Sequence, residues 1–145
     1  MHEIKRSPII HLLIGLGLFA AAAISMYWIL WFLAPQTIQV FGPGSPEYPT
    51  YVAFEQAFLL ADPWLALVAL CGAIGFLYKQ RWGLLCMLLA GSSAIFLGLM
   101  DLMYDLQHGV FASLTGEAAV EMVIVALLLG LGVSVIILTW REIRH

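Results

Sequence analysis

The sequence predicts an all-α, polytopic membrane protein, a bundle of four transmembrane helices that forms a single domain over residues 1–145. Composition supplies two of the observations behind this prediction, because 63% of the 145 residues are hydrophobic and only 10% are charged. A soluble domain carries about 25% charged residues. The third observation is that the apolar residues fall into four long runs, each long enough to cross a bilayer. A soluble globular protein is therefore nearly excluded.

The four apolar runs predict the four helices in order. They span about residues 9–33, 51–78, 82–104 and 117–140. At a rise of about 1.5 Å per residue, runs of roughly 23 to 28 residues reach about 35 to 42 Å, more than the hydrocarbon core of about 30 Å. Helices are expected because lipid offers no partner to peptide groups, and the runs lack the alternation of barrel strands. The first run is too long for a signal peptide, so we expect it to remain as a membrane helix.

The basic residues predict the orientation of the bundle. They are Lys5, Arg6, Lys79, Arg81, Arg141 and Arg144. With four spans, the N-terminus, the turn at 79–81 and the C-terminal tail share one side, which the positive-inside rule makes cytoplasmic. We therefore expect a multi-pass protein of the plasma (cytoplasmic) membrane with both termini inside. The predicted outer loops, 34–50 and 105–116, contain neither Lys nor Arg.

The first outer loop is rich in proline, with prolines at positions 35, 43, 46 and 49. It is therefore expected to be extended or turn-rich and to cover the mouth of the bundle, although a plain stiff connector is the simpler interpretation. Aromatic residues near the ends of the runs are expected to form interfacial belts. Those near the outer ends include Trp28, Trp31 and Tyr51, and those near the inner ends include Tyr78 and Trp140.

The positions of the acidic residues are the most informative feature. Six of the nine lie within or at the ends of predicted helices, namely Glu55, Asp62, Asp101, Asp105, Glu117 and Glu121. Glu55, Asp101 and Glu121 each lie about one turn from the outer end of a different helix. Asp62 lies about two turns deeper than Glu55, directly before Pro63, which weakens the helix there. We therefore expect three acidic faces to converge in the outer half of the bundle.

Helical spacing supports this convergence. Asp101, Asp105 and His108 follow the spacing i, i+4, i+7, so they share a face if the helix continues that far. The acidic faces continue inward through small residues, which are Gly91, Ala94 and Gly98 on the third helix, Ala66, Ala69 and Ala73 on the second, and Gly132 on the fourth. Small residues let membrane helices approach closely, so these faces are expected to point into the bundle.

Several carboxyl groups within a bilayer need an explanation, because each charge costs about 2.5–3.5 kcal/mol on insertion scales. Three explanations are open: the groups hold protons, they bind a cation, or they lie in a water-filled vestibule. A simpler alternative places Asp105, Glu117 and Glu55 at the headgroup level. This alternative suits Glu117 best, because it follows Thr115 at a helix start, where acidic residues favour the helix dipole.

The first functional hypothesis is a carboxylate-lined, outward-facing site that binds a cation, either a metal ion or a proton, with transport as one use. Its candidate binding residues are Glu55, Gln56, Asp62, Asp101, Asp105 and Glu121. The candidate metal ligands are Asp101, Asp105, His108 and Glu121, a set that suits a hard divalent ion, or iron or zinc if His108 takes part. A lone histidine at a helix end is more often a surface or capping residue. The inner half has no matching polar relay, which favours a blind pocket over a pore.

The second hypothesis is a membrane enzyme or binding protein for a small hydrophobic ligand, in which one protonated and one ionised carboxyl group act as acid and base. Its candidate catalytic residues are Glu55, Asp62, Asp101, Glu121 and Tyr104. A third hypothesis is an accessory subunit whose acidic outer face docks a partner, and assembly as a homo-oligomer is also open.

Other chemistries are not indicated. Cys71 and Cys86 lie on different predicted helices and form no Cys-x-x-Cys motif, so a disulfide redox pair is not expected. Haem would need facing histidines within the membrane, and nucleotide binding would need a phosphate loop. The net charge of −3 provides no basic patch for nucleic acid. A divalent metal ion is the one cofactor that the pattern suggests.

Overall fold

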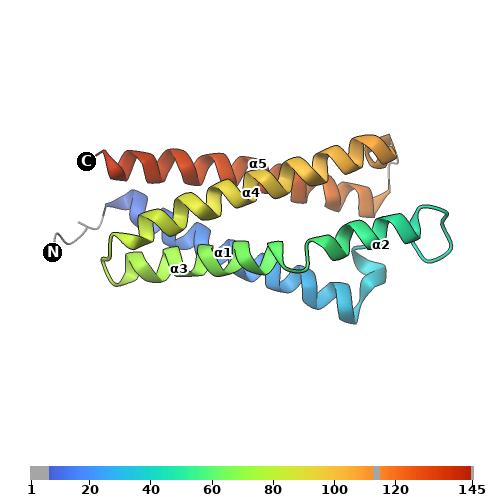
Figure 1. Ribbon diagram of the computed structural model, residues 1–145, viewed down its shortest axis with the longest axis horizontal. Helices are drawn as coiled ribbons and strands as arrows, with labels where there is room; N and C mark the ends of the chain where they lie inside the picture. Colours follow the sequence, from blue (N-terminus) through green and yellow to red (C-terminus); the bar gives the residue numbers. More distant parts are fainter. Residues whose placement is uncertain (1–6, 113–114, 145) are drawn as a thin grey trace.

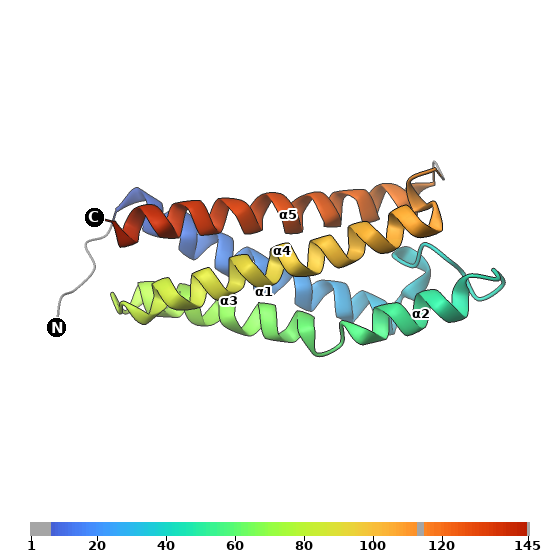
Figure 2. The same cartoon turned by 45° about the horizontal axis from the view of Figure 1, so that its top comes forward.

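The computed structural model describes residues 7–112 and 115–144, and all regular structure in that part of the chain is helical. Four helical segments are long and apolar enough to cross a membrane. They run antiparallel in sequence order, side by side in one bundle (Figures 1 and 2). Their helices are α1 (Pro8–Leu33), α2 (Tyr48–Ala57) with α3 (Ala61–Leu77), α4 (Trp82–His108) and α5 (Gly116–Ile143). The predicted all-α architecture with four apolar spans is confirmed.

The two ends of the bundle differ in charge. The end that holds the α3–α4 turn and the last turn of α5 carries Lys79, Arg81, Arg141 and Arg144, and we call it the basic end. The opposite end, where α2 begins and α4 ends, is called the acidic end (Figure 1). The four described basic residues thus share one end, as the sequence predicts, whereas Lys5 and Arg6 lie outside the described residues.

Side-chain hydrogen bonds cap the N-termini of α1 and α5. The Ser7 side chain accepts a hydrogen bond from the Ile10 N–H, and Pro8 occupies the first helical position, where a missing N–H costs nothing. The Ser7 hydroxyl also donates to Glu142 at 2.6 Å, which ties α1 to α5 at the basic end. Thr115 caps α5 in the same way through the Ala118 N–H. Glu117 lies in the first turn of α5, where its charge favours the helix dipole.

The second predicted helix, residues 51–78, is interrupted. It consists of α2 and α3, which are separated by residues 58–60. Pro63 explains the interruption, because it has no N–H to donate to the carbonyl of residue 59 and its ring excludes a regular turn there. The break places Glu55 in α2 and Asp62 in the first turn of α3.

Several helix boundaries differ from those predicted. Helix α4 continues to His108 instead of ending at 104, because Gly109 adopts the left-handed conformation and donates its N–H to the Asp105 carbonyl. Asp105 is therefore helical and does not belong to a loop over 105–116. Helix α5 spans 116–143 rather than 117–140. The loop predicted over 34–50 ends at 47, since α2 begins at Tyr48 with a proline in its first turn.

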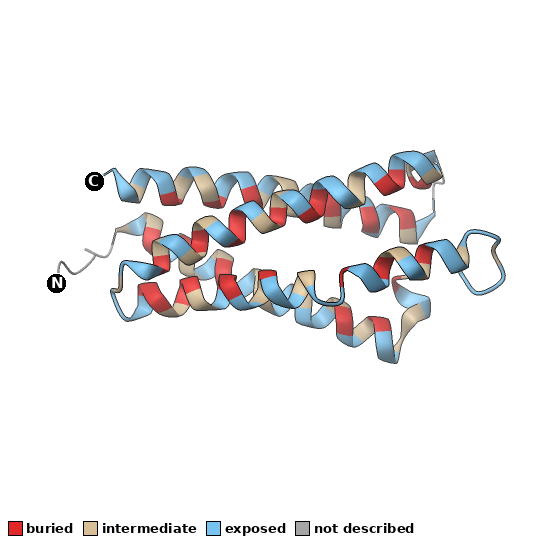
Figure 3. Cartoon of the chain, viewed as in Figure 1, coloured by how far each residue is buried: buried red, intermediate tan, exposed pale blue. Residues whose placement is uncertain are grey.

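Buried residues lie on the inward faces of the helices (Figure 3). Near the basic end, the core contains Ile10, Leu13, Ala73, Phe76, Met87 and Val135. The other core cluster includes Trp28, Trp31 and Tyr51. These three aromatic residues are buried and do not form the predicted outer belt. Tyr78 and Trp140 are exposed on the outside of the bundle, as expected of belt residues.

Candidate functional site

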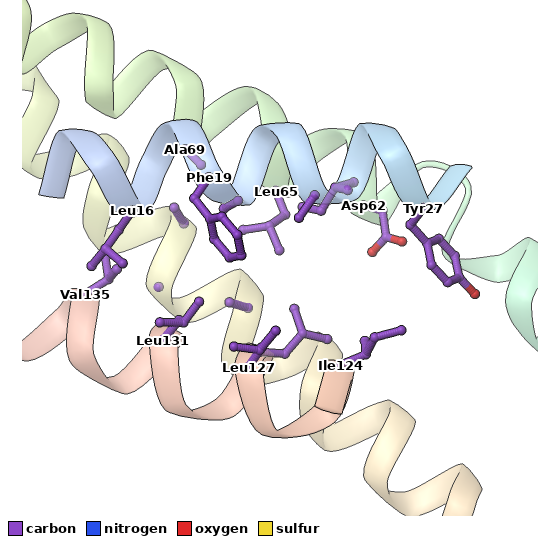
Figure 4. A pocket seen from close by; sticks show the side chains of 18 of the residues that line it. Leu16, Phe19, Tyr27, Asp62, Leu65, Ala69, Ile124, Leu127, Leu131 and Val135 are labelled. Carbon is purple, nitrogen blue, oxygen red and sulfur yellow. The ribbon is translucent and has the colours of Figure 1, made fainter. Parts of the chain in front are cut away.

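A cavity of about 170 Å³ lies within the bundle and is lined by residues of all five α-helices. Most of its wall is apolar. In Figure 4, Leu16 and Phe19 of α1 lie opposite Leu127 and Leu131 of α5 across the cavity. Phe19 and Leu127 line the cavity and yet are 50% and 41% exposed. The cavity is therefore open on its side, in the gap between α1 and α5.

Four carboxyl groups line this cavity, each from a different helix. They are Glu55 of α2, Asp62 of α3, Asp101 of α4 and Glu121 of α5. The Asp62 carboxyl group points into the space between α1 and α5 (Figure 4). The groups are close enough to interact electrostatically, Glu121 with Glu55 and Asp101, and Asp101 also with Asp62. The structure thus brings together the four acidic residues that the sequence proposes as a site.

Two of the four carboxyl groups receive hydrogen bonds from α1. The Tyr27 hydroxyl donates to Glu55 Oε2 at 2.7 Å, and the Trp28 indole N–H donates to Asp62 Oδ2 at 3.0 Å. Neither donor is predicted from the sequence, because Trp28 is expected in an interfacial belt and Tyr27 has no predicted role. A signal was available, since adjacent Tyr and Trp near the outer end of an acid-free helix can supply donors to acids on neighbouring helices.

The other two carboxyl groups have no hydrogen-bond partner within the described residues. Glu121 is only 7% exposed, and Asp101 is partly buried. Both residues line the cavity. None of the lining residues is Lys, Arg or His. The cavity wall thus offers no basic side chain that could pair with the four carboxyl groups.

Asp105, Tyr104 and His108 lie beyond the cavity, near the end of α4. Asp105 is 3% exposed, and neither its Oδ2 atom nor the Tyr104 hydroxyl has a hydrogen-bond partner within the described part of the chain. The His108 ring stacks on Tyr104 with ring centroids 4.0 Å apart, and its Nδ1 atom lies 2.9 Å from the Tyr104 carbonyl oxygen. Tyr104 and His108 belong to an aromatic cluster with Phe54 and Tyr51.

The structure also locates the other residues that the sequence proposes as ligands. Gln56 is exposed and does not line the cavity, so the structure does not bring it to the four carboxyl groups. Within residues 7–112 and 115–144, no group of three or more His, Cys, Asp or Glu side chains is arranged to hold a metal ion. This includes the proposed set of Asp101, Asp105, His108 and Glu121. Cys71 and Cys86 are both free thiols.

Comparison with protein-family models, with curated proteins and with solved structures gives no significant match. The function therefore has to be inferred from the chemistry of the cavity. An apolar wall with carboxyl groups gathered at one end can hold an amphiphilic molecule, or it can hold protons.

Proposed function

We propose that this protein is a membrane protein that binds a small lipophilic molecule, which reaches the cavity from the bilayer through the gap between α1 and α5. The observation that carries the proposal is the division of the cavity wall, which is apolar along most of its length and carboxylic at one end. Ligand sites commonly combine an apolar wall with a few convergent polar groups. The apolar part would bind the body of the ligand, and the carboxyl groups would bind its polar end.

The size of the cavity limits the ligand. Cavities for drug-sized molecules measure about 300–1,000 Å³, and a dry apolar cavity of about 150 Å³ holds a molecule of the size of benzene. The volume of about 170 Å³ therefore suits a polar group and the first few carbon atoms attached to it. A longer chain would continue between α1 and α5 into the lipid.

Mass spectrometry of molecules that co-purify with the protein tests this proposal. The protein is extracted from its membrane with a nanodisc-forming polymer, without detergent, and lipophilic molecules are identified in the solvent extract. The discriminating variant is Ala23→Trp, because Ala23 lines the open side of the cavity. Its matched control is Ala22→Trp, because Ala22 is the exposed neighbour on the same helix and does not line the cavity.

We expect a stoichiometric lipophilic molecule in the wild-type and Ala22→Trp proteins and its loss, by about 10-fold or more, from Ala23→Trp. The added indole fills the gap and excludes the ligand, whereas the control indole faces lipid. The same amount of extracted molecule in both variants would show that it is bulk lipid rather than a ligand, and the proposal would then be wrong.

The grouping of the described basic residues at one end supports an orientation for the bundle. We propose a multi-pass protein of the plasma membrane with the basic end and both termini in the cytoplasm, since cytoplasmic segments carry an excess of Lys and Arg. The acidic end then faces outward. Reporter fusions to the C-terminus test this orientation, and activity of a reporter that functions only outside the cytoplasm would contradict it.

Proton binding by the same carboxyl groups is the second candidate function. It is favoured by Asp101 and Glu121, which have no hydrogen-bond partner among the described residues. A continuous path for protons through the bundle is not supported, because the cavity wall toward the basic end is formed by apolar residues such as Met87 and Val135. We therefore expect proton binding without flux. Proteoliposomes with an internal pH dye test this expectation, and a flux that Glu121→Gln abolishes would favour transport instead.

A further inference from the structure

We propose that the polar end of the ligand is an ammonium group, so that the protein binds lipophilic amines. This inference rests on the proposed function and specifies its ligand class. It depends on Glu121, which is more than nine-tenths buried, lines the cavity and has no hydrogen-bond partner within the described residues. A buried polar group without a partner is costly, and a ligand that donates to Glu121 would remove this cost.

The charges around the cavity favour a cation over an anion. Four carboxyl groups converge there, and no lining residue is basic. An anionic head group, such as a carboxylate or a phosphate, would be repelled by these groups whenever they are ionised, since the medium has a low dielectric. A neutral hydroxyl group could donate one hydrogen bond but would offset no charge. Only a cation would both donate to the carboxyl groups and neutralise them.

The geometry favours an organic cation over a metal ion. Divalent metal ions need several oxygen ligands at about 2.0–2.6 Å, and no described group of three acids is arranged to hold one. An ammonium group forms hydrogen bonds of about 2.7–2.9 Å to carboxylates. It can thus bridge oxygen atoms that are farther apart. Its alkyl substituent would also occupy the apolar wall, which a metal ion leaves empty.

Two features of the site agree with this chemistry. Tyr27 and Trp28 each donate to one oxygen atom of Glu55 and Asp62, whereas both oxygen atoms of Asp101 and Glu121 are left for a ligand. The aromatic side chains of Phe19, Tyr27 and Phe58 also line the cavity, and aromatic ring faces attract ammonium cations.

Three probes with the same alkyl chain test the head group: n-octylamine, n-octanol and n-octanoate. An alkylamine is cationic at pH 7, as the lysine side chain is. Binding to the full-length protein in phosphatidylcholine nanodiscs is measured by calorimetry, with empty nanodiscs subtracted to remove partitioning into lipid. The variants are Glu121→Gln and Asp101→Asn. The matched control is Glu117→Gln, which removes the same charge from the same helix but does not line the cavity.

We expect saturable binding of octylamine to the wild type, about 10-fold or more tighter than that of octanol, since a hydrogen bond to a charged group exceeds a neutral one by roughly this factor. Glu121→Gln and Asp101→Asn should each weaken octylamine binding about 10-fold and change octanol binding about 2-fold or less. Glu117→Gln should change neither. Octanol binding also reports whether a variant retains its fold. If one variant no longer binds octanol, the proposal is judged from the other variant and from the wild-type preference for octylamine over octanol.

The outcomes separate the two proposals. Octanol or octanoate binding as tightly as octylamine would overturn the amine proposal while supporting the lipophilic site. Octylamine binding that neither Glu121→Gln nor Asp101→Asn weakens would also overturn it. If none of the three probes binds saturably, both proposals are wrong.

Discussion

The two halves of the bundle differ in how closely their helices approach. In the half toward the basic end, glycines bring backbones into contact, and a Cβ atom on Gly75 would lie 2.7 Å from the Cα atom of Gly83. Farther along, Gly91 and Gly132 face each other, and a Cβ atom on either would lie 2.9 Å from the carbonyl oxygen of the other. Toward the acidic end, α1 and α5 separate (Figure 1), and the cavity between them reaches from Met87 and Val135 to the four carboxyl groups.

This difference shows how one small bundle accommodates both packing and a site. Lipid competes with helices for apolar contact, so close approach at small residues provides much of the attraction between membrane helices. The narrow half supplies this attraction. The wide half contains hydrogen bonds between helices beside the cavity, such as that of Tyr27 with Glu55. Variants in the narrow half should therefore lose stability through disturbed packing, and variants in the wide half through lost hydrogen bonds.

The largest effect on stability is expected in the narrow half. Gly75→Ala places a methyl group against the Gly83 backbone, which cannot move without shifting α3 or α4. Overpacking of this kind costs about 1–3 kcal/mol, and for a chain of this size each 1 kcal/mol lowers the Tm by roughly 2–4 °C. Thermal unfolding of the purified protein in detergent, followed by tryptophan fluorescence, measures the change.

The control for this variant is Gly130→Ala. Gly130 is also helical, but an added Cβ atom would meet nothing within 4 Å. Alanine is favoured over glycine in a helix by about 0.5–1 kcal/mol, so this variant should be as stable as the wild type or slightly more so. If Gly75→Ala were as stable as Gly130→Ala, the close approach of α3 and α4 would be contradicted.

An intermediate effect is expected in the wide half from Tyr27→Phe, which removes the hydroxyl group that donates to Glu55. Hydrogen bonds between membrane helices contribute about 0.6 kcal/mol on average and up to about 1.7 kcal/mol. The buried acceptor favours the upper part of this range. A double-mutant cycle with Glu55→Ala isolates the interaction, because Tyr27→Phe should cost little once Glu55 is absent. Equal costs in both backgrounds would mean that the two residues do not interact.

The architecture could be predicted from the sequence because it depends mainly on the hydrophobicity and the length of the apolar runs. Four apolar runs are sufficient to predict four helices. Their ends were less predictable, since Gly109 closes α4 through a backbone conformation that composition does not reveal. The break before Asp62 was indicated by Pro63, but whether a proline bends a helix or interrupts it depends on packing with neighbours.

The acidic part of the site was also accessible from the sequence, because Glu55, Asp101 and Glu121 lie at similar depths on helices that must pack together. Its hydrogen bonds were not accessible. Whether Trp28 faces lipid or Asp62 depends on the rotation of α1 about its axis, and α1 is apolar on all sides. A helix without an amphipathic pattern gives no signal for that rotation.

The smallest effect is expected from Thr139 in the narrow half. Its side chain is fully buried in the bundle, and its hydroxyl group has no hydrogen-bond partner among the described residues. Thr139→Val keeps the shape of the side chain and removes the unsatisfied hydroxyl group, so stability should rise by up to about 1 kcal/mol, or the Tm by roughly 2–4 °C.

The control is Ser134→Ala, because Ser134 is exposed on the same helix and donates a hydrogen bond to the Gly130 carbonyl. This control should change the stability by no more than about 0.5 kcal/mol. A Thr139→Val protein less stable than wild type by about 1 kcal/mol would contradict the absence of a partner for the Thr139 hydroxyl group, because it would reveal a buried polar contact there.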